Sequence, residues 1–224
     1  RRVYDKVHEL RARKLIMSEC GHGYRSTACE GPNWAGYHID FQMESSVITM
    51  LRYIKEGRIK VDKSKNPGSY TFHDSCNNAR SCGLFEEPRE LLRLVVEDFR
   101  EMYPNRAENF CCTGGGGAMS MAEYTPRRLK SASVKARQMA ATGADYVVTS
   151  CHNCVDGLSD VIKHYDLPMK VTQLVNLVAN ALVIEKAAEI TTAPAVAEEQ
   201  LLAGYTILVV DDEPDVREFL STVV

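Results

Sequence analysis

The sequence lacks a strong excess of charge of either sign. Its 27 lysine and arginine residues nearly balance its 30 aspartate and glutamate residues, which gives a formal net charge of −3. Proteins that bind the phosphate backbone of a nucleic acid normally show a basic surplus or a basic stripe. The balance of charges therefore argues against nucleic acid as a partner.

Long hydrophobic runs are missing as well. The apolar segment from Leu174 to Ile184 is interrupted by Asn176 and Asn180, so it falls short of the roughly 18 apolar residues of a membrane-spanning helix. The chain begins with Arg1 and stops inside an apolar stretch at Val224. We expect both ends to be cut, so the lack of a signal peptide indicates nothing about targeting.

The composition is otherwise that of an ordinary globular protein, except for its cysteines. A length of 224 residues with 45% hydrophobic and 25% charged residues suits one good-sized domain, or one domain plus a fragment. The eight cysteines are at positions 20, 29, 76, 82, 111, 112, 151 and 154. A disulfide framework is the less favoured interpretation, because a chain of this length does not need disulfide bonds for stability. The adjacent Cys111 and Cys112 also suit a disulfide framework poorly. Metal ligation in a reducing compartment is favoured.

Alternation of helices and strands predicts an α/β fold with a parallel sheet. Helices are predicted at residues 1–14, 44–56, 88–102, 127–142, 155–165 and 173–187, and strands at residues 15–17, 69–73, 146–148 and 169–171. A weak internal repeat relates residues 3–20, followed by helix 44–56, to residues 127–154, followed by helix 173–186. We therefore expect two tandem half-domains, of which the first is incomplete.

The predicted domain organisation has three parts. Residues 1–187 form the cysteine-rich domain, with 1–60 as the remnant of the first half and 61–187 as the second half. Residues 188–203 have the Ala, Thr, Glu and Pro content of a linker. Residues 204–224 contain a predicted buried strand that ends in Asp211 and Asp212. This stretch resembles the start of a response-regulator receiver domain, which implies a truncated Mg²⁺-binding acid pair without its phosphoacceptor; an ordinary strand and turn is the alternative.

Five of the cysteines follow a spaced pattern. Cys76 is followed after 34 residues by Cys111-Cys112 and after 38 more by Cys151-x-x-Cys154. Thiolates are soft ligands suited to iron–sulfur clusters and zinc. Structural zinc usually takes four ligands from two Cys-x-x-Cys knuckles, so five cysteines around an adjacent pair favour a cluster. Three of the chain's cysteine groups follow predicted strands, at the edge where open α/β sheets collect their ligand sites.

A run of glycines follows the adjacent cysteines. Gly114, Gly115, Gly116 and Gly117 would let the backbone approach an inorganic core closely and point N–H groups at sulfur. A phosphate-binding loop is the competing interpretation. The Lys-Ser/Thr pair that such a loop needs does not follow the glycines.

The cysteine pattern, together with His73-Asp74-Ser75-Cys76, resembles the cysteine-rich (CCG) domain of the heterodisulfide reductase family, in particular its D-type and DsrK-like iron–sulfur proteins. The resemblance implies tandem Rossmann-like half-domains and a [4Fe-4S] cluster of the noncubane type. It implies that Cys76, Cys111, Cys112, Cys151 and Cys154 are the metal ligands. Thr113 stands where the family usually has glycine, which is costly if that position requires a positive φ.

The resemblance also implies a function. We expect an oxidoreductase component that transfers electrons in the thiol–disulfide chemistry of an anaerobic respiratory complex. Its partners would be other redox subunits, some of them membrane-bound, and a thiol or disulfide substrate. The location would be cytoplasmic, including the inner face of the membrane. Two alternatives stay open: a redox sensor coupled to a receiver domain, and a zinc-stabilised interaction module.

Further candidates lie near the cysteine pattern. Cys82 is either a substrate-facing catalytic thiol or a small buried apolar residue. Cys20 could approach the cluster, and Cys29 has no predicted partner. His73 and His152 would assist cofactor binding by hydrogen bonds. The basic helix with Arg127, Arg128, Lys130, Lys135 and Arg137 is either a solvated face or a docking surface for an acidic redox partner.

Overall fold

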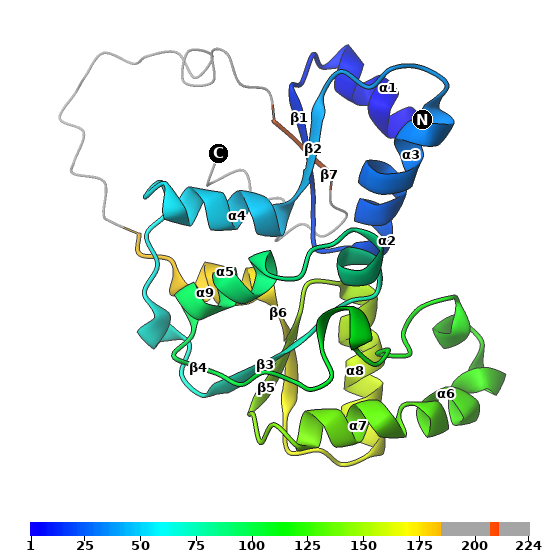
Figure 1. Cartoon of the computed structure of the whole chain (residues 1–224), viewed down its shortest axis with the longest axis vertical. Helices are drawn as coiled ribbons and strands as arrows, with labels where there is room; N and C mark the ends of the chain where they lie inside the picture. The colour runs from blue at the N-terminus through cyan, green and yellow to red at the C-terminus, as the bar shows by residue number, and fades with distance from the viewer. Residues whose placement is uncertain (185–206, 211–224) are drawn as a thin grey trace.

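The computed structural model describes residues 1–184 and 207–210 (Figure 1). Every strand pair in these ranges is parallel, and the strands form two sheets, of order β2-β1-β7 and β4-β3-β5-β6. The α/β class with parallel sheets is confirmed. The predicted linker and the acid pair Asp211 and Asp212 lie outside the described residues.

Residues 1–60, the predicted first half, are arranged around β1. Their elements are α1 (Arg2–Glu9), β1 (Lys14–Met17), α2 (Gly21–Tyr24), the π-helical turn η1 (Arg25–Glu30), α3 (Gly31–Ala35), β2 (Gln42–Ser45) and α4 (Ser46–Lys55). Tyr4 and Val7 of α1 pack with Leu15 of β1, Tyr24 and Phe41 in one apolar cluster. This cluster fixes α1 and α2 against the strands.

The second half (residues 61–184) contains the larger sheet. Its elements are η2 (Lys63–Lys65), β3 (Ser69–His73), the π-helical turn η3 (Asn77–Ser81), α5 (Glu87–Val95), β4 (Asp98–Phe99), η4 (Arg106–Glu108), η5 (Ala118–Ser120), η6 (Ala122–Tyr124), α6 (Thr125–Ser131), α7 (Ser133–Ala140), β5 (Tyr146–Thr149), α8 (His152–His164), β6 (Lys170–Gln173) and α9 (Leu174–Ala181). Among the described residues, no helix is both long and apolar enough to cross a membrane.

Helices cover both faces of the larger sheet (Figure 1). On one face Phe72 and Val148 pack against α4, α5 and α9. On the other face Val147 packs against α7 and α8 in a cluster that also contains Cys112. Because α4 belongs to the first half, that half contributes to the core on the α5 and α9 face of the larger sheet.

The strand topology repeats between the halves. β1 pairs in parallel with β2, and helices lie between these two strands in the chain. β5 pairs in parallel with β6 in the same way, with α8 between them. On the other edge of β1 lies β7 (Ile207–Val210), with Lys14 opposite Ile207. That is the position that β3 takes beside β5, with Tyr70 opposite Tyr146. The strand expected near residues 206–210 therefore joins the sheet of the first half.

Several helix predictions were wrong at their ends; the helix predicted at 1–14, for example, ends at Glu9. The helix predicted at 88–102 ends at Val95, and Phe99 belongs to β4, where it lies opposite Tyr70. Apolar residues four positions apart satisfy a helical period, but pairing with β3 extends this segment. Residues 42–45 form β2, and Ser45 caps α4 by accepting the N–H of Val47 at 3.3 Å. The predicted basic helix is two helices, α6 and α7, that meet at Ala132.

Candidate metal centre

The larger sheet delivers two of the cysteine groups to one edge. β3 ends at His73, three residues before Cys76, and β5 ends at Thr149, two residues before Cys151. His73 and Thr149 lie opposite each other in the parallel register. Cys154 lies in the first turn of α8. Neighbouring parallel strands thus place these cysteines at their carboxyl ends, as the sequence predicts.

The five-thiol group consists of Cys76, Cys111, Cys112, Cys151 and Cys154, whose sulfur atoms form one contiguous set. The sulfurs of Cys112 and Cys154 are 3.2 Å apart. Thiol hydrogen bonds connect Cys76 with Cys111, Cys111 with Cys112, and Cys154 with Cys151. Cys112, Cys151 and Cys154 are buried, whereas Cys76 is half-buried and Cys111 is exposed. The group is therefore enclosed on one side and open beside Cys111.

Two backbone N–H groups point at these sulfurs. Thr113 donates to Cys111 at 3.2 Å and Gly114 donates to Cys112 at 3.4 Å. Thr113 has a φ of +64°, which is uncommon for a β-branched residue. Its buried hydroxyl has no hydrogen-bond partner. Thr113 therefore occupies a position whose positive φ favours glycine.

Close backbone approach explains one of the four consecutive glycines. A Cβ on Gly114 would lie 2.1 Å from the carbonyl oxygen of Asn153 on α8. Facing it, a Cβ on Gly157 would lie 2.7 Å from the carbonyl oxygen of Cys112. The cysteine loop and α8 therefore meet backbone to backbone. Gly116 and Gly117 have φ values of +69° and +74° with open space around them, so they serve the turn of the loop.

We expect Gly157→Ala to destabilise the protein by about 1–3 kcal/mol, because the added methyl overpacks the contact between α8 and the Cys112 loop. Chemical denaturation of the variant measures the change. Gly116→Ala is the control, since it meets no neighbour and adds only backbone strain of about 1 kcal/mol. Equal losses in the two variants would contradict the tight contact.

The thiols divide into two types by their pKa. Hydrogen bonds from Cys112 and Cys76 lower the pKa of Cys111 to about 2. A hydrogen bond from Cys154 lowers the pKa of Cys151 to about 6. The partner thiols have raised pKa values because they donate to these neighbours. The group therefore favours negative charge at two of its sulfurs, which suits a cation or a cationic cluster core.

Two buried nitrogen side chains adjoin the thiols. His73 is fully buried with no hydrogen-bond partner on either ring nitrogen. Its ring nitrogen and the sulfurs of Cys112 and Cys154 lie within 4.8 Å of one another. Burial lowers the pKa of His73 well below its usual value, which keeps the imidazole neutral and able to act as an acceptor or a ligand.

Lys135 is the second of these side chains, and the sequence did not predict it as part of the site. It is 0% exposed, and its Nζ contacts Gln138 and, at 3.6 Å, the sulfur of Met102. No carboxylate forms an ion pair with it within residues 1–184. Burial lowers its pKa to about 8, while the neighbouring Cys112 opposes this shift. The solvated-face interpretation is wrong for Lys135.

The rest of the basic helix divides between surface and interior. Arg128 is buried and forms an ion pair with Asp160, so the solvated-face interpretation is wrong here too. Arg127, Lys130 and Arg137 are exposed. Only these three residues remain for the predicted docking surface, which stays a prediction.

A buried ion pair fixes the segment that leads to Cys76. Arg89 of α5 donates to both oxygens of Asp74, at 2.7 and 2.8 Å, and the two side chains are 0% and 1% exposed. Asp74 also accepts the N–H of Arg106 at 2.7 Å. Closer to the thiols, Arg80 donates to the carbonyls of Ala107, at 2.6 Å, and Asn109. These bonds tie the Cys76 turn to the chain entering Cys111.

The first half forms one wall of the centre. A Cβ on Gly21 would lie 3.3 Å from the sulfur of Cys151. The N–H of His152 donates to the carbonyl of Glu19 at 2.9 Å, and the side chains of His22 and Asn153 are 3.0 Å apart. Burial raises the pKa of the Glu19 carboxyl to about 8. The turn that follows β1 therefore covers the turn that follows β5.

The remaining predicted residues lie around this arrangement. The thiol of Cys20 accepts the N–H of Gly23 at 3.3 Å and caps α2. The side chain of His152 is exposed, and its cofactor role stays a prediction. Cys82 is half-buried and pairs with Cys29 rather than with the five-thiol group. The sequence did not indicate that pairing.

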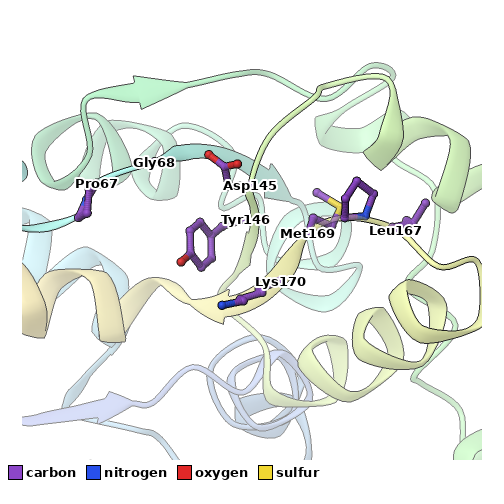
Figure 2. A pocket seen from close by; sticks show the side chains of 8 residues that line it. Pro67, Gly68, Asp145, Tyr146, Leu167, Met169 and Lys170 are labelled. Atoms are coloured by element: carbon purple, nitrogen blue, oxygen red, sulfur yellow. The ribbon is translucent and has the colours of Figure 1, made fainter.

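A separate hollow of about 590 Å³ lies at the opposite end of the strands (Figure 2). Pro67 and Gly68 before β3, Asp145 before β5, and Met169 before β6 contribute to its lining. Asp145 is engaged by the N–H and hydroxyl of Ser69, at 2.8 and 2.7 Å. The cysteines follow the other ends of these strands, so the hollow is not part of the metal centre.

Residues 70–158 match the family described as "Cysteine-rich domain" (CCG). This segment is therefore similar to CCG cysteine-rich domains. It begins in β3 and extends into α8, so it contains all of the five-thiol group.

Curated relatives extend the similarity beyond the CCG segment. The chain is 30% identical over 175 residues to a dihydromethanophenazine:CoB–CoM heterodisulfide reductase subunit of Methanosarcina mazei, an alignment that covers 77% of this chain and 42% of the relative. It is 33% identical over 223 residues to "Hdr-like menaquinol oxidoreductase iron-sulfur subunit 2" of Archaeoglobus fulgidus, which covers 82% of this chain and 40% of the relative.

Similarity also reaches a bacterial protein. "Probable iron-sulfur-binding oxidoreductase FadF" of Bacillus subtilis is 27% identical over 172 residues, with 75% of this chain and 24% of the relative covered. The chain spans about two fifths of the length of the two archaeal relatives. The chain is thus similar to iron–sulfur proteins of redox enzymes.

Proposed function

We propose that the five-thiol group holds an iron–sulfur cluster and that the chain is the electron-transferring part of a redox complex that acts on thiols and disulfides. The observation that carries the proposal is the convergence of five thiols from three separate chain segments on one sheet edge. A group of thiols that is enclosed on one side, with a low pKa at two of its members, fits a cationic iron core better than it fits a hydrophobic interior.

The residues around the thiols fit such a core. His73 has two unpartnered nitrogens in the buried interior, and an unpartnered buried polar group is costly unless a further partner is bound. Lys135 places a positive charge beside the sulfurs, which balances the net negative charge of thiolate-ligated clusters. Cys76, Cys111, Cys112, Cys151 and Cys154 would be the ligands, with the Thr113 and Gly114 N–H groups donating to sulfur.

A bound cluster would supply single electrons, and two such transfers with two protons convert a disulfide into two thiols. The chain contributes access and exclusion of water. The exposed Cys111 side is where a disulfide substrate can approach, while the wall from the first half shields Cys151. This proposal includes a cluster of the [4Fe-4S] noncubane type and redox partner subunits. It also includes a location at the inner face of the membrane and tandem Rossmann-like halves.

Anaerobic purification with iron and acid-labile sulfide analysis tests it. We expect about four irons per chain with matching sulfide, and an EPR signal of the oxidised form that changes when a thiol is added. A folded protein with about one zinc and no iron would replace the proposal with a zinc module. The group of His73, Cys112 and Cys154 is the observation that favours this alternative.

Lys135→Met should lower the midpoint potential of the cluster by tens of millivolts, on the order expected for removing one partly screened charge. The loss of a buried positive charge makes it harder to add an electron. An EPR-monitored redox titration measures the shift, with Lys130→Met, an exposed residue of α6, as the control. Identical potentials in the two variants would show that Lys135 does not act on the centre.

A further inference from the structure

A second pair of cysteines lies outside the five-thiol group. Cys29 belongs to η1 of the first half, and Cys82 follows η3 of the second half. η1 packs against η3, and this contact brings the two thiols within interaction distance of each other. Cys29 is exposed and Cys82 is half-buried. One thiol that solvent reaches, backed by another in contact with it, is the arrangement that thiol–disulfide exchange requires.

Contacts between η1 and η3 hold the pair in place. Arg25 of η1 forms an ion pair with Glu30 at 2.5 Å, and its Nη1 donates to the side chain of Asn77 at 3.3 Å. On the Cys82 side, the N–H of Gly83 donates to the carbonyl of Ala79 at 2.7 Å. The first-half core also packs against the Cys82 side chain. The two thiols thus meet at a fixed crossing of the halves.

Charge and burial give the two thiols different roles. Burial, together with the hydrogen bond to Cys29, raises the pKa of Cys82 to about 12, whereas Arg25 opposes the shift. Cys82 therefore stays a thiol and donates to its partner. The exposed Cys29 is the sulfur that a solution disulfide can reach.

We propose that Cys29 and Cys82 form a redox-active dithiol that exchanges with small-molecule disulfides, separately from the metal centre. The Cys29 thiolate attacks one sulfur of the disulfide RSSR, which forms a mixed disulfide and releases RS⁻. Cys82 gives its proton to that thiolate and attacks the Cys29 sulfur, which releases the second thiolate, protonated by solvent. The protein loses two electrons and gains one disulfide, and RSSR becomes two thiols.

The resulting bond would join the two halves beside the metal centre. η3 (Asn77–Ser81) separates Cys76 from Cys82, and Asn77 lies close to Gly21, whose added Cβ would be 3.1 Å from the Cβ of Asn77. A cross-link here therefore fixes the wall that covers Cys151. The oxidation state of the dithiol would therefore determine whether the first half is covalently held against the Cys151 turn.

The test uses the anaerobically purified chain with its metal and bis(2-hydroxyethyl) disulfide as the probe. Free thiols are alkylated afterwards, and the peptides are mapped by mass spectrometry. We expect the wild type to lose both free thiols and to yield a Cys29–Cys82 cross-linked peptide. Cys82→Ser should retain the probe on Cys29, and Cys29→Ser should leave Cys82 unmodified. Cys20→Ser, which removes another turn cysteine, should cross-link like the wild type.

Two results would overturn the dithiol. One is a wild type in which Cys29 and Cys82 both remain alkylatable; the other is a persistent probe adduct on Cys29 with Cys82 free. The cross-linked peptide forms whether or not iron is bound, so iron-free protein that still cross-links would end the cluster proposal and leave this one standing.

Discussion

Cys112→Ser should lose essentially all bound iron. Cys112 is 4% exposed and lies at the centre of the five-thiol group, hydrogen-bonded to Cys111 and 3.2 Å from the Cys154 sulfur. A serine hydroxyl is a harder and far less acidic donor than a thiol, and iron–sulfur clusters are held by thiolates.

Iron and acid-labile sulfide per chain, measured on anaerobically purified protein, give the result. Cys29→Ser is the matched control, because it removes an exposed cysteine that interacts with Cys82 and is not one of the five thiols. It should retain the iron of the wild type. A Cys112→Ser variant with wild-type iron and an unchanged EPR signal would rule out Cys112 as a ligand.

Arg89→Met should destabilise the protein by about 3–5 kcal/mol, the usual cost of breaking a buried ion pair at one partner. The substitution leaves the buried carboxylate of Asp74 without the two bonds that Arg89 donates, and it also removes bonds of 2.8 and 2.9 Å to Glu101. Since Asp74 lies two residues before Cys76, we also expect a looser Cys76 and weaker iron retention.

Chemical denaturation followed by circular dichroism measures the loss of stability. Arg93→Met on the same helix is the control, because Arg93 is exposed and lies over the ring of Phe99 in a cation–π arrangement at 5.3 Å. It should cost under about 1 kcal/mol. Equal effects at the two positions would mean that the Asp74–Arg89 pair does not stabilise the fold.

The parts of the fold that the sequence predicted best are those with strong local signals. β3 and β5 are short runs of β-branched and aromatic residues bounded by turns, and both appear where expected, at Ser69–His73 and Tyr146–Thr149. Because these strands are parallel neighbours, the turns after them had to meet, and Cys76 and Cys151 do lie at the same edge of the sheet. Cys111 and Cys112 do not directly follow a strand, so the strand pattern alone did not predict their approach to this edge.

Features that depend on tertiary pairing could not be predicted in this way. β4 has only two residues. Phe99 fits a helical period in the sequence, but its pairing with Tyr70 of β3 places it in a strand. Lys135 resembles its exposed neighbours in sequence, but it faces Met102 and the thiols. Cys29 meets Cys82 only because η1 packs on η3. No local pattern marks such an encounter.

The shared boundary of the halves has a practical consequence. Gly21 and the Glu19 carbonyl shield the Cys151 turn from the other side of the molecule, although they contribute none of the five sulfurs. A fragment consisting of the second half alone would keep all five thiols yet present this flank to dissolved oxygen. Iron would then be lost in air from a polypeptide whose complement of ligands is intact.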